Sequence, residues 1–181
     1  MPGPKGAARK PILFDAAVLR AFGEAIQPAP TPPPSAQQRH LGELILRRRQ
    51  LVEFVVAEAN RSAHYAEALP RRQAAALLRT LRCQIAHCNR AIAALIAQDE
   101  AMAVRAARLT QVPGVDAVTA ATLLAEMPKL DALSDQKAAA LTGVAPYNCT
   151  SGPWEGTRRI SGGRASVRGA LYMARLERRP L

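Results

Sequence analysis

A regular row of apolar residues between positions 78 and 95 constrains the fold of this 181-residue chain more than any other feature. Its members recur in steps of three and four: Leu78, Leu81, Ile85, Cys88, Ile92 and Leu95. This is the a/d pattern of a coiled-coil helix, whose stripe faces a partner helix. A second helical stripe precedes it, formed by Leu41, Leu44, Leu51 and Val55. We therefore predict two long helices packed as an antiparallel hairpin, the first covering residues 37–68 and ended by Pro70 in a short "ALPRR" turn.

The composition agrees with a helical fold. Hydrophobic residues make up 49% of the chain and aromatic residues only 4%, so the core must be built from Ala, Leu, Val and Ile. Ala and Leu lead the scale of helix propensity. Residues 12–26 also predict a short amphipathic helix, with Ile12, Val18, Leu19, Phe22 and Ile26 at helical spacing. The five prolines of "QPAPTPPPSA" then predict a stiff, extended linker at residues 27–36.

Three observations bear on the compartment. No run of 18 apolar residues exists, so we expect no membrane span. The N-terminal stretch has basic residues but no long apolar segment, which argues against secretion. Cys83, Cys88 and Cys149 cannot all pair within one chain. We therefore expect a cytoplasmic, reduced protein.

The spacing of Cys83, His87 and Cys88 invites a test for a metal site. A zinc site would need a fourth ligand, and no candidate lies nearby in the sequence. Cys88 also belongs to the apolar row. We therefore predict no metal site here, but a buried thiol and a histidine on the helix surface.

The positive charge is concentrated in two parts of the chain. The net charge is +11, with 12 basic and 6 acidic side chains in residues 37–111 and 7 arginines against two glutamates in residues 151–181. Residues 112–150 are slightly acidic, with 2 basic and 4 acidic side chains. This distribution favours binding to a nucleic acid, because neutralised phosphates supply most of non-specific affinity. The alternative is a solubilising surface.

The stretch "LTQVPGVDAVTAATLLAEM" predicts a helix end, a tight turn at Pro113 and Gly114, and a new helix capped by Asp116. This pattern resembles a helix-hairpin-helix DNA-binding motif, whose turn offers backbone N–H groups to a phosphate. Asp116 stands where the motif usually has glycine, and its carboxylate would repel a phosphate. The alternative is a plain Pro-Gly joint between two packed helices. Further on, we predict a short helix from Ser134 to Gly143 and a basic final helix.

The stretch "APYNCTSGPWEGTRRISGGR", residues 145–164, has the residue types of a phosphodiester-cleaving site. A hydroxyl nucleophile needs access, a base and cations that stabilise the developing charge. Glycines flank Ser151 and Ser161, and four arginines follow at positions 158, 159, 164 and 168. No histidine follows His87, so a base would have to be a carboxylate, a metal-bound hydroxide or part of another domain.

The run "VPGVDAVTAATLLAEMPKLDALSDQKAAALTGVAPYNCTSGPWEGTRRISGGRASVRGALYMA" closely resembles the C-terminal domain of the IS110 family of insertion-sequence transposases. The match covers roughly residues 105–175, and upstream stretches resemble the segment that leads into the family's coiled coil. The resemblance implies a C-terminal domain with a catalytic serine, paired with a RuvC-like DEDD domain. It also implies DNA as substrate, magnesium bound by the DEDD carboxylates in full-length members, and guidance by a bridge RNA.

Carried over residue by residue, the resemblance assigns the catalytic serine to Ser151 and the last DEDD carboxylate to Asp15. Ile12 stands where the preceding aspartate is expected, and the first Asp and the Glu have no counterpart. We therefore expect a truncated transposase that is not catalytic alone and holds no metal by itself. The implied DNA-binding residues are Pro113, Gly114, Gly152, Arg158, Arg159, Arg164 and Arg168.

Other hydroxyl and aromatic residues have simpler interpretations. Ser161 and Ser166 are predicted to be turn or capping residues before the final helix. Tyr147 and Tyr172 would suit a tyrosine recombinase, but no histidine accompanies the arginines. We therefore predict that Tyr172 packs the final helix onto the core. Trp154 is predicted to anchor its loop, although it could also stack on a base.

The sequence thus predicts an all-α protein, in which a long helical hairpin precedes a compact helical module with a helix-hairpin-helix-like turn. We divide it into a remnant of the DEDD domain at 1–26, a linker at 27–36, a coiled-coil hairpin at 37–108 and a transposase domain with a serine loop at 109–181. The predicted function is DNA-binding and DNA transposition, with a dimer or higher oligomer formed through the coiled coil. The alternative is a non-catalytic, dimeric nucleic-acid-binding protein.

Overall fold

The structure is a computed structural model, and it describes residues 12–27, 33–151, 154–160 and 162–177. The chain divides into two compact units, Met1–Pro34 and Ser35–Leu181. The described part is mainly helical, as predicted, with seven α-helices, one 3-10 turn and two short strands. None of the described helices is long and apolar enough to cross a membrane.

The first unit contains the predicted amphipathic helix. Helix α1 covers Ile12–Ile26, which confirms the bounds read from the sequence. Arg20 and Glu24, one helical turn apart, form an ion pair with 2.8 Å between Nε and Oε1. The large apolar side chains at Val18, Leu19 and Phe22 are exposed.

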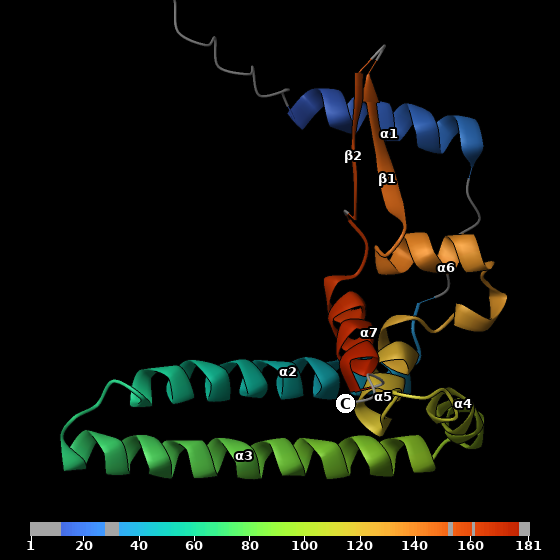
Figure 1. The fold of residues 1–181 in the computed structure, drawn as a ribbon. Helices are drawn as coiled ribbons and strands as arrows, with labels where there is room; N and C mark the ends of the chain where they lie inside the picture. Colours follow the sequence, from blue (N-terminus) through green and yellow to red (C-terminus); the bar gives the residue numbers. More distant parts are fainter. Residues whose placement is uncertain (1–11, 28–32, 152–153, 161, 178–181) are drawn as a thin grey trace, which may run out of the picture. The chain divides into compact units, whose positions relative to one another are not determined.

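The second unit begins with the helical hairpin. Helix α2 covers Ala36–Ser62 and helix α3 covers Ala68–Ala97, and the two run side by side in opposite directions (Figure 1). The Ser35 hydroxyl caps α2 by accepting from the Gln38 backbone N–H at 3.0 Å. The predicted position of the turn was wrong. The connection is at residues 63–67, and Pro70 lies in the first turn of α3, where its missing N–H costs no helical hydrogen bond.

The predicted apolar seam of α3 is confirmed as the face that packs against α2. Ile92 and Leu95 are buried, and the other members of the row are half-buried. On α2, Leu41 and Leu51 are buried as expected. A hydrogen bond of 2.7 Å from Arg48 Nε to Asn89 Oδ1 adds a polar link between the helices.

The rest of the unit is the helical module. Its helices are α4 at Glu100–Thr110, α5 at Ala117–Glu126, α6 at Asp135–Thr142 and α7 at Ala165–Glu177, with a 3-10 turn, η1, at Leu130–Ala132. One apolar cluster joins α2 and α3 to α4 and α5, and it contains Leu41, Ile45, Ile92, Leu95, Met102, Ala121 and Leu124. A second cluster packs Val167 of α7 against Leu123 and Met127. Burial of these apolar surfaces is the main force holding the module to the hairpin.

The predicted cap of α5 is confirmed. Asp116 Oδ1 accepts from the Thr119 backbone N–H at 2.7 Å, and the predicted cap of α6 has Ser134 Oγ at 3.4 Å from the Lys137 nitrogen. The helix from Ser134 ends at Gly143, also as predicted.

We predict that Asp116→Ala lowers the free energy of unfolding by about 1 kcal/mol, because an N–H group at the helix start loses its acceptor. Asp116→Asn should be nearly neutral, since Asn is an equally good cap. Ser134→Ala should cost less than Asp116→Ala, because its contact is longer. Urea denaturation of the three variants checks the order, and an equal cost for Asp116→Ala and Asp116→Asn would contradict the role of the cap.

The predicted serine loop is instead a β-hairpin. Strand β1 covers Pro146–Ser151 and strand β2 covers Trp154–Ile160, paired antiparallel (Figure 1). The β-hairpin lies between α6 and α7 in the chain. Its two strands are the one departure from an all-helical fold in the described part. The backbone groups of a polar, glycine-containing segment are satisfied here by strand pairing, which the sequence analysis did not foresee.

Candidate functional site

The candidate nucleophile lies at the far end of the β-hairpin, which we call the serine hairpin (Pro146–Ser151 and Trp154–Ile160). Ser151 is the last residue of β1, and its backbone pairs with that of Trp154. Arg159 pairs with Tyr147 near the start of β1, and an irregularity in register follows between Tyr147 and Cys149. Four residues separate Trp154 from Arg158 along β2, about 13 Å at about 3.3 Å per residue. The backbones of the two arginines therefore lie nearer the base of the hairpin than Ser151 does.

The base of the hairpin is closed by contacts between the end of α6 and the start of α7. We call residues 141–143 and 162–164, with Arg168, the hairpin base. The Arg164 backbone N–H donates to the Leu141 carbonyl at 2.9 Å. Arg168 Nη1 donates to the Gly162 carbonyl at 2.7 Å. The first bond links the segment before β1 to the segment after β2, and the second holds the segment after β2 to α7. Together they fix where the hairpin begins.

Two glycine backbones touch at this base. Gly143 and Gly163 have φ values of 74° and 66°, a left-handed conformation that favours glycine. A Cβ built on Gly163 would overlap the Gly143 nitrogen and would lie 2.5 Å from the Gly143 Cα. The sequence predicts Gly143 as the end of a helix and Gly163 as part of a turn. At these two positions the structure shows that the glycines also permit the close approach of two chain segments.

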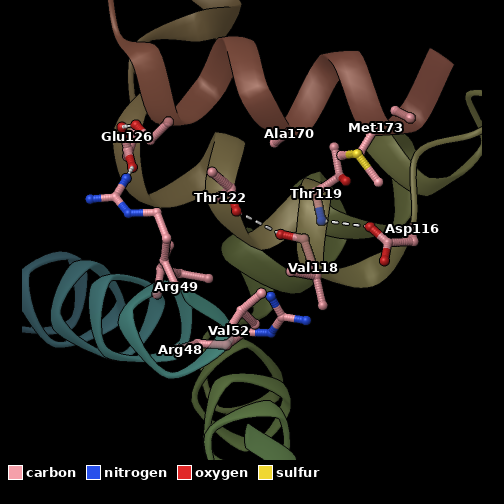
Figure 2. A pocket seen from close by; sticks show the side chains of 13 residues that line it. Arg48, Arg49, Val52, Asp116, Val118, Thr119, Thr122, Glu126, Ala170 and Met173 are labelled. Carbon is pink, nitrogen blue, oxygen red and sulfur yellow. Dashed lines mark hydrogen bonds and ion pairs between the residues drawn. The ribbon is translucent and has the colours of Figure 1, made fainter. Parts of the chain in front are cut away.

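A polar link holds the start of α7 against its neighbours. Ser166 Oγ donates a hydrogen bond to Glu126 Oε2 on α5, and Glu126 Oε1 lies 3.9 Å from Arg49 Nη1 on α2. Figure 2 shows Glu126 and Arg49 pointing toward one another from their two helices. The prediction that Ser166 is a turn or capping residue was wrong. It lies in the first turn of α7, and its hydroxyl fixes α7, and with it the hairpin base, to α5.

An open groove of about 340 Å³ runs between α2, α5 and α7 (Figure 2). Apolar groups such as Val52, Ala170 and Met173 line its middle, and the Glu126 link lies at one side. Inside it, Thr122 Oγ1 donates to the Val118 carbonyl at 2.8 Å and is thereby satisfied. The side chains of Thr122, Ser166 and Glu126 in this groove thus have partners within the fold.

The turn between α4 and α5 presents Pro113 at the surface. Pro113 is exposed, Gly114 has a φ of 88°, and the Val115 N–H donates to the Val112 carbonyl at 3.0 Å. The arrangement is a helix, a tight turn and a second helix, as the sequence predicts. The Asp116 carboxylate is engaged by the first turn of α5 and is exposed beside the turn.

The outer face of α7 is exposed. Arg164 and Arg175 are exposed, and Tyr172 is 62% exposed. The prediction that Tyr172 packs the helix onto the core was wrong, because Val167 and Ala174 on the opposite side of α7 make that contact. The phenol ring remains at the surface, next to basic residues in the sequence.

The remaining predicted residues fall elsewhere in the chain. Asp15 lies in α1, in the first unit, whereas Ser151 belongs to the second. Gly152 and Ser161 lie outside the described residues. Cys83 and His87 are exposed and Cys88 is half-buried on α3. In the described ranges, no three His, Cys, Asp or Glu side chains come together as a possible metal site.

Sequence reasoning missed the partners that build the hairpin base. Leu141 and Gly143 precede the serine segment, and Glu126 is 40 residues from Ser166. The helix-ending glycine of "LTGV" and the pair of glycines in "SGGR" were the available signals. They mark places where the chain turns, but they do not show that the two places touch.

Comparison with known families gives one finding for the part of the chain that contains the serine hairpin. Residues 106–179 match the model of the family described as Transposase IS116/IS110/IS902 family. The matched residues include α5, α6, the serine hairpin and α7. A comparison of the chain with curated proteins finds no match. Residues 106–179, less than half of the chain, thus resemble this transposase family, and the match supports an insertion-sequence transposase function.

Proposed function

We propose, from the transposase-family domain at residues 106–179, that this chain is the DNA-binding, serine-bearing part of an insertion-sequence transposase. The observation that carries the proposal is that the matched segment includes the serine hairpin, with Ser151 at the end of β1 away from the hairpin base. A residue at this end of a two-stranded hairpin is separated along the backbone from the helical core. We infer that the hairpin carries Ser151 to a bulky, extended substrate such as DNA.

In the proposed reaction Ser151 attacks a DNA phosphodiester. A bond forms between Ser151 Oγ and phosphorus, and the bond from phosphorus to the bridging oxygen of the leaving strand breaks. That oxygen leaves with the electron pair and takes up a proton, while the serine proton passes to a base. Arg158 and Arg159 on β2 are the nearest predicted cations along the hairpin, and guanidinium groups match the geometry of phosphate oxygens.

Magnesium is implied for full-length family members by the resemblance, through carboxylates of a DEDD domain. The described residues of this chain do not fit that ion, because no three possible ligands come together among them. Asp15 is the single position that matches a DEDD carboxylate. We therefore propose that this chain contributes the serine and the DNA-binding surface, and that the remaining carboxylates must be supplied to it.

The proposed DNA contacts outside the hairpin are the α4–α5 turn and the hairpin base. Pro113 and Gly114 form an exposed turn of the kind that approaches a phosphate, although Asp116 beside it opposes a close approach. Arg164 is exposed, whereas Arg168 is already bonded to the Gly162 carbonyl. A bridge RNA belongs to the proposal on the resemblance alone, and an oligomer formed through the helical hairpin belongs to it on the apolar row of α3.

A covalent-trapping experiment tests the role of Ser151. The full chain is incubated with Mg²⁺, the DEDD domain of a full-length relative, and duplex DNA that carries bridging phosphorothiolates, whose sulfur leaves without protonation. We expect a protein–DNA adduct that survives denaturing electrophoresis and is abolished in Ser151→Ala, because the attacking oxygen is gone. Thr157→Ala, which removes an exposed hydroxyl from β2 of the same hairpin, should retain the adduct.

An adduct of equal yield in Ser151→Ala would refute Ser151 as the nucleophile. If the chain binds DNA but forms no adduct in any version, the alternative is supported, namely a non-catalytic nucleic-acid-binding protein. That alternative also predicts a dimer in sedimentation, since it assigns the helical hairpin to self-association.

A further inference from the structure

One exposed face of α3 is basic along most of the helix and carries no acidic residue. This 30-residue helix contains no Asp or Glu, and its five arginines are Arg71, Arg72, Arg79, Arg82 and Arg90. At about 100° per residue, all five fall within an arc of about 100° on the helix. The centre of the apolar seam lies about 120° around the helix from the centre of this arc, and Leu78 at the edge of the seam borders it. We call these five side chains the α3 arginine face, and all of them are exposed.

The charges of this face are not neutralised by the fold. Within the part of the chain that the structure describes, none of the five makes an ion pair or a side-chain hydrogen bond. Arginines elsewhere do have partners: Arg61 pairs with Glu58 at 2.8 Å, and Arg105 pairs with Asp131 at 3.0 Å. Five unpaired guanidinium groups on one face repel one another, so the face is most stable with an anionic partner.

The shape of the face suits a long polyanion. Residues 71–90 span about 28 Å at about 1.5 Å per residue, close to one turn of B-form DNA. An open hollow of about 510 Å³ lies on the face, and Arg72, Arg79 and Arg82 line it together with the apolar residues Ala75 and Leu78. Guanidinium groups bind phosphate oxygens with two parallel hydrogen bonds. Three of them around one hollow provide a place for a backbone phosphate.

We propose that the α3 arginine face binds the sugar–phosphate backbone of duplex DNA without reading its sequence. A second copy of this face would be repelled by like charge, so self-association does not account for it. Single strands are held by stacking of bases on aromatic side chains, and α3 contains no Phe, Trp or Tyr. A rigid helix that carries arginines along its length instead suits the stiff backbone of a duplex. The inference goes beyond the proposed role of Ser151 and does not depend on it.

A pair of matched double variants tests the proposal. Arg72→Gln/Arg79→Gln removes two charges from the face, and Arg20→Gln/Arg61→Gln removes two exposed but paired arginines elsewhere. Binding of the full chain to a 30-bp fluorescent duplex is measured by anisotropy over a range of salt concentrations. We expect the slope of log Kd against log salt to fall by about 2 in the first variant, with an affinity loss of about 50-fold near 0.1 M salt. The control variant should keep the wild-type slope.

The outcomes separate the proposal from its rivals. Arg72→Lys/Arg79→Lys should keep the wild-type slope, because the number of positive charges, rather than the shape of the guanidinium group, sets counterion release.

Equal losses in both double variants, or no binding of duplex by the wild-type chain, would overturn the proposal. Tighter binding to single-stranded DNA or to duplex RNA would also overturn it, in favour of that ligand. Circular dichroism confirms that each variant is folded. Ser151→Ala should leave the slope unchanged, which distinguishes this proposal from the catalytic one.

Discussion

Replacing Gly163 with alanine is expected to destabilise the hairpin base by about 3 kcal/mol. The new Cβ would overlap the backbone nitrogen of Gly143 and would lie 2.5 Å from its Cα. Backbone atoms cannot move aside as a flexible side chain can. Alanine would also be held at a φ of 66°, in the left-handed region that L-residues avoid.

Gly162→Ala is the matched control, because Gly162 has nearly the same φ, 69°, but no atom within 4 Å of a built Cβ. It should cost only the conformational strain, about 1 kcal/mol. Hydrogen exchange at the Arg164 amide, which donates to the Leu141 carbonyl, reports the opening of the base directly. Equal protection of that amide in the two variants would show that the close approach of Gly143 and Gly163 does not hold the base together.

This pair of variants also bears on function. The position of Ser151 depends on the path of both strands, and that path starts at the hairpin base. If Ser151 acts as proposed, Gly163→Ala should reduce adduct formation more than Gly162→Ala, although neither glycine carries a functional group. A loss of adduct without a loss of DNA binding would indicate that the geometry of the hairpin is what fails.

The sequence predicts the helices well because their signals are local. The apolar row of α3 repeats every three or four residues, so the buried face can be read from the spacing alone. Asp116 and Ser134 were predicted as helix starts because a cap needs only residues within one turn. The misplaced turn has a local cause too. Pro70 was interpreted as a helix end, yet proline is equally suited to a first turn.

The strands and the site contacts were not predictable in this way. Pairing of Tyr147 with Arg159 joins residues 12 apart, in a segment with no strict alternation of apolar and polar side chains. The contact of Ser166 with Glu126 crosses 40 residues. The exposed position of Tyr172 was not predictable either, because helical spacing alone does not show which side of α7 faces the core. Such contacts depend on how helices pack, and packing is decided by the whole fold.

The second large effect is expected at Leu41, whose side chain is completely buried in the cluster that joins the helical hairpin to the module. Leu41→Ala should lower the free energy of unfolding by about 3 kcal/mol, because it removes apolar contacts and leaves a cavity between α2 and α5. Urea denaturation followed by circular dichroism measures the loss.

Leu46→Ala, five residues further along α2, is the matched control. Leu46 is 44% exposed, so the same truncation should change stability by less than about 0.5 kcal/mol. A comparable loss at both positions would contradict the assignment of the stabilising contacts to the buried cluster. A single urea transition in Leu41→Ala, with the slope of the wild type, would show that the helical hairpin and residues 106–179 unfold as one cooperative unit. DNA held on the α3 arginine face would then be coupled mechanically to the domain that bears Ser151.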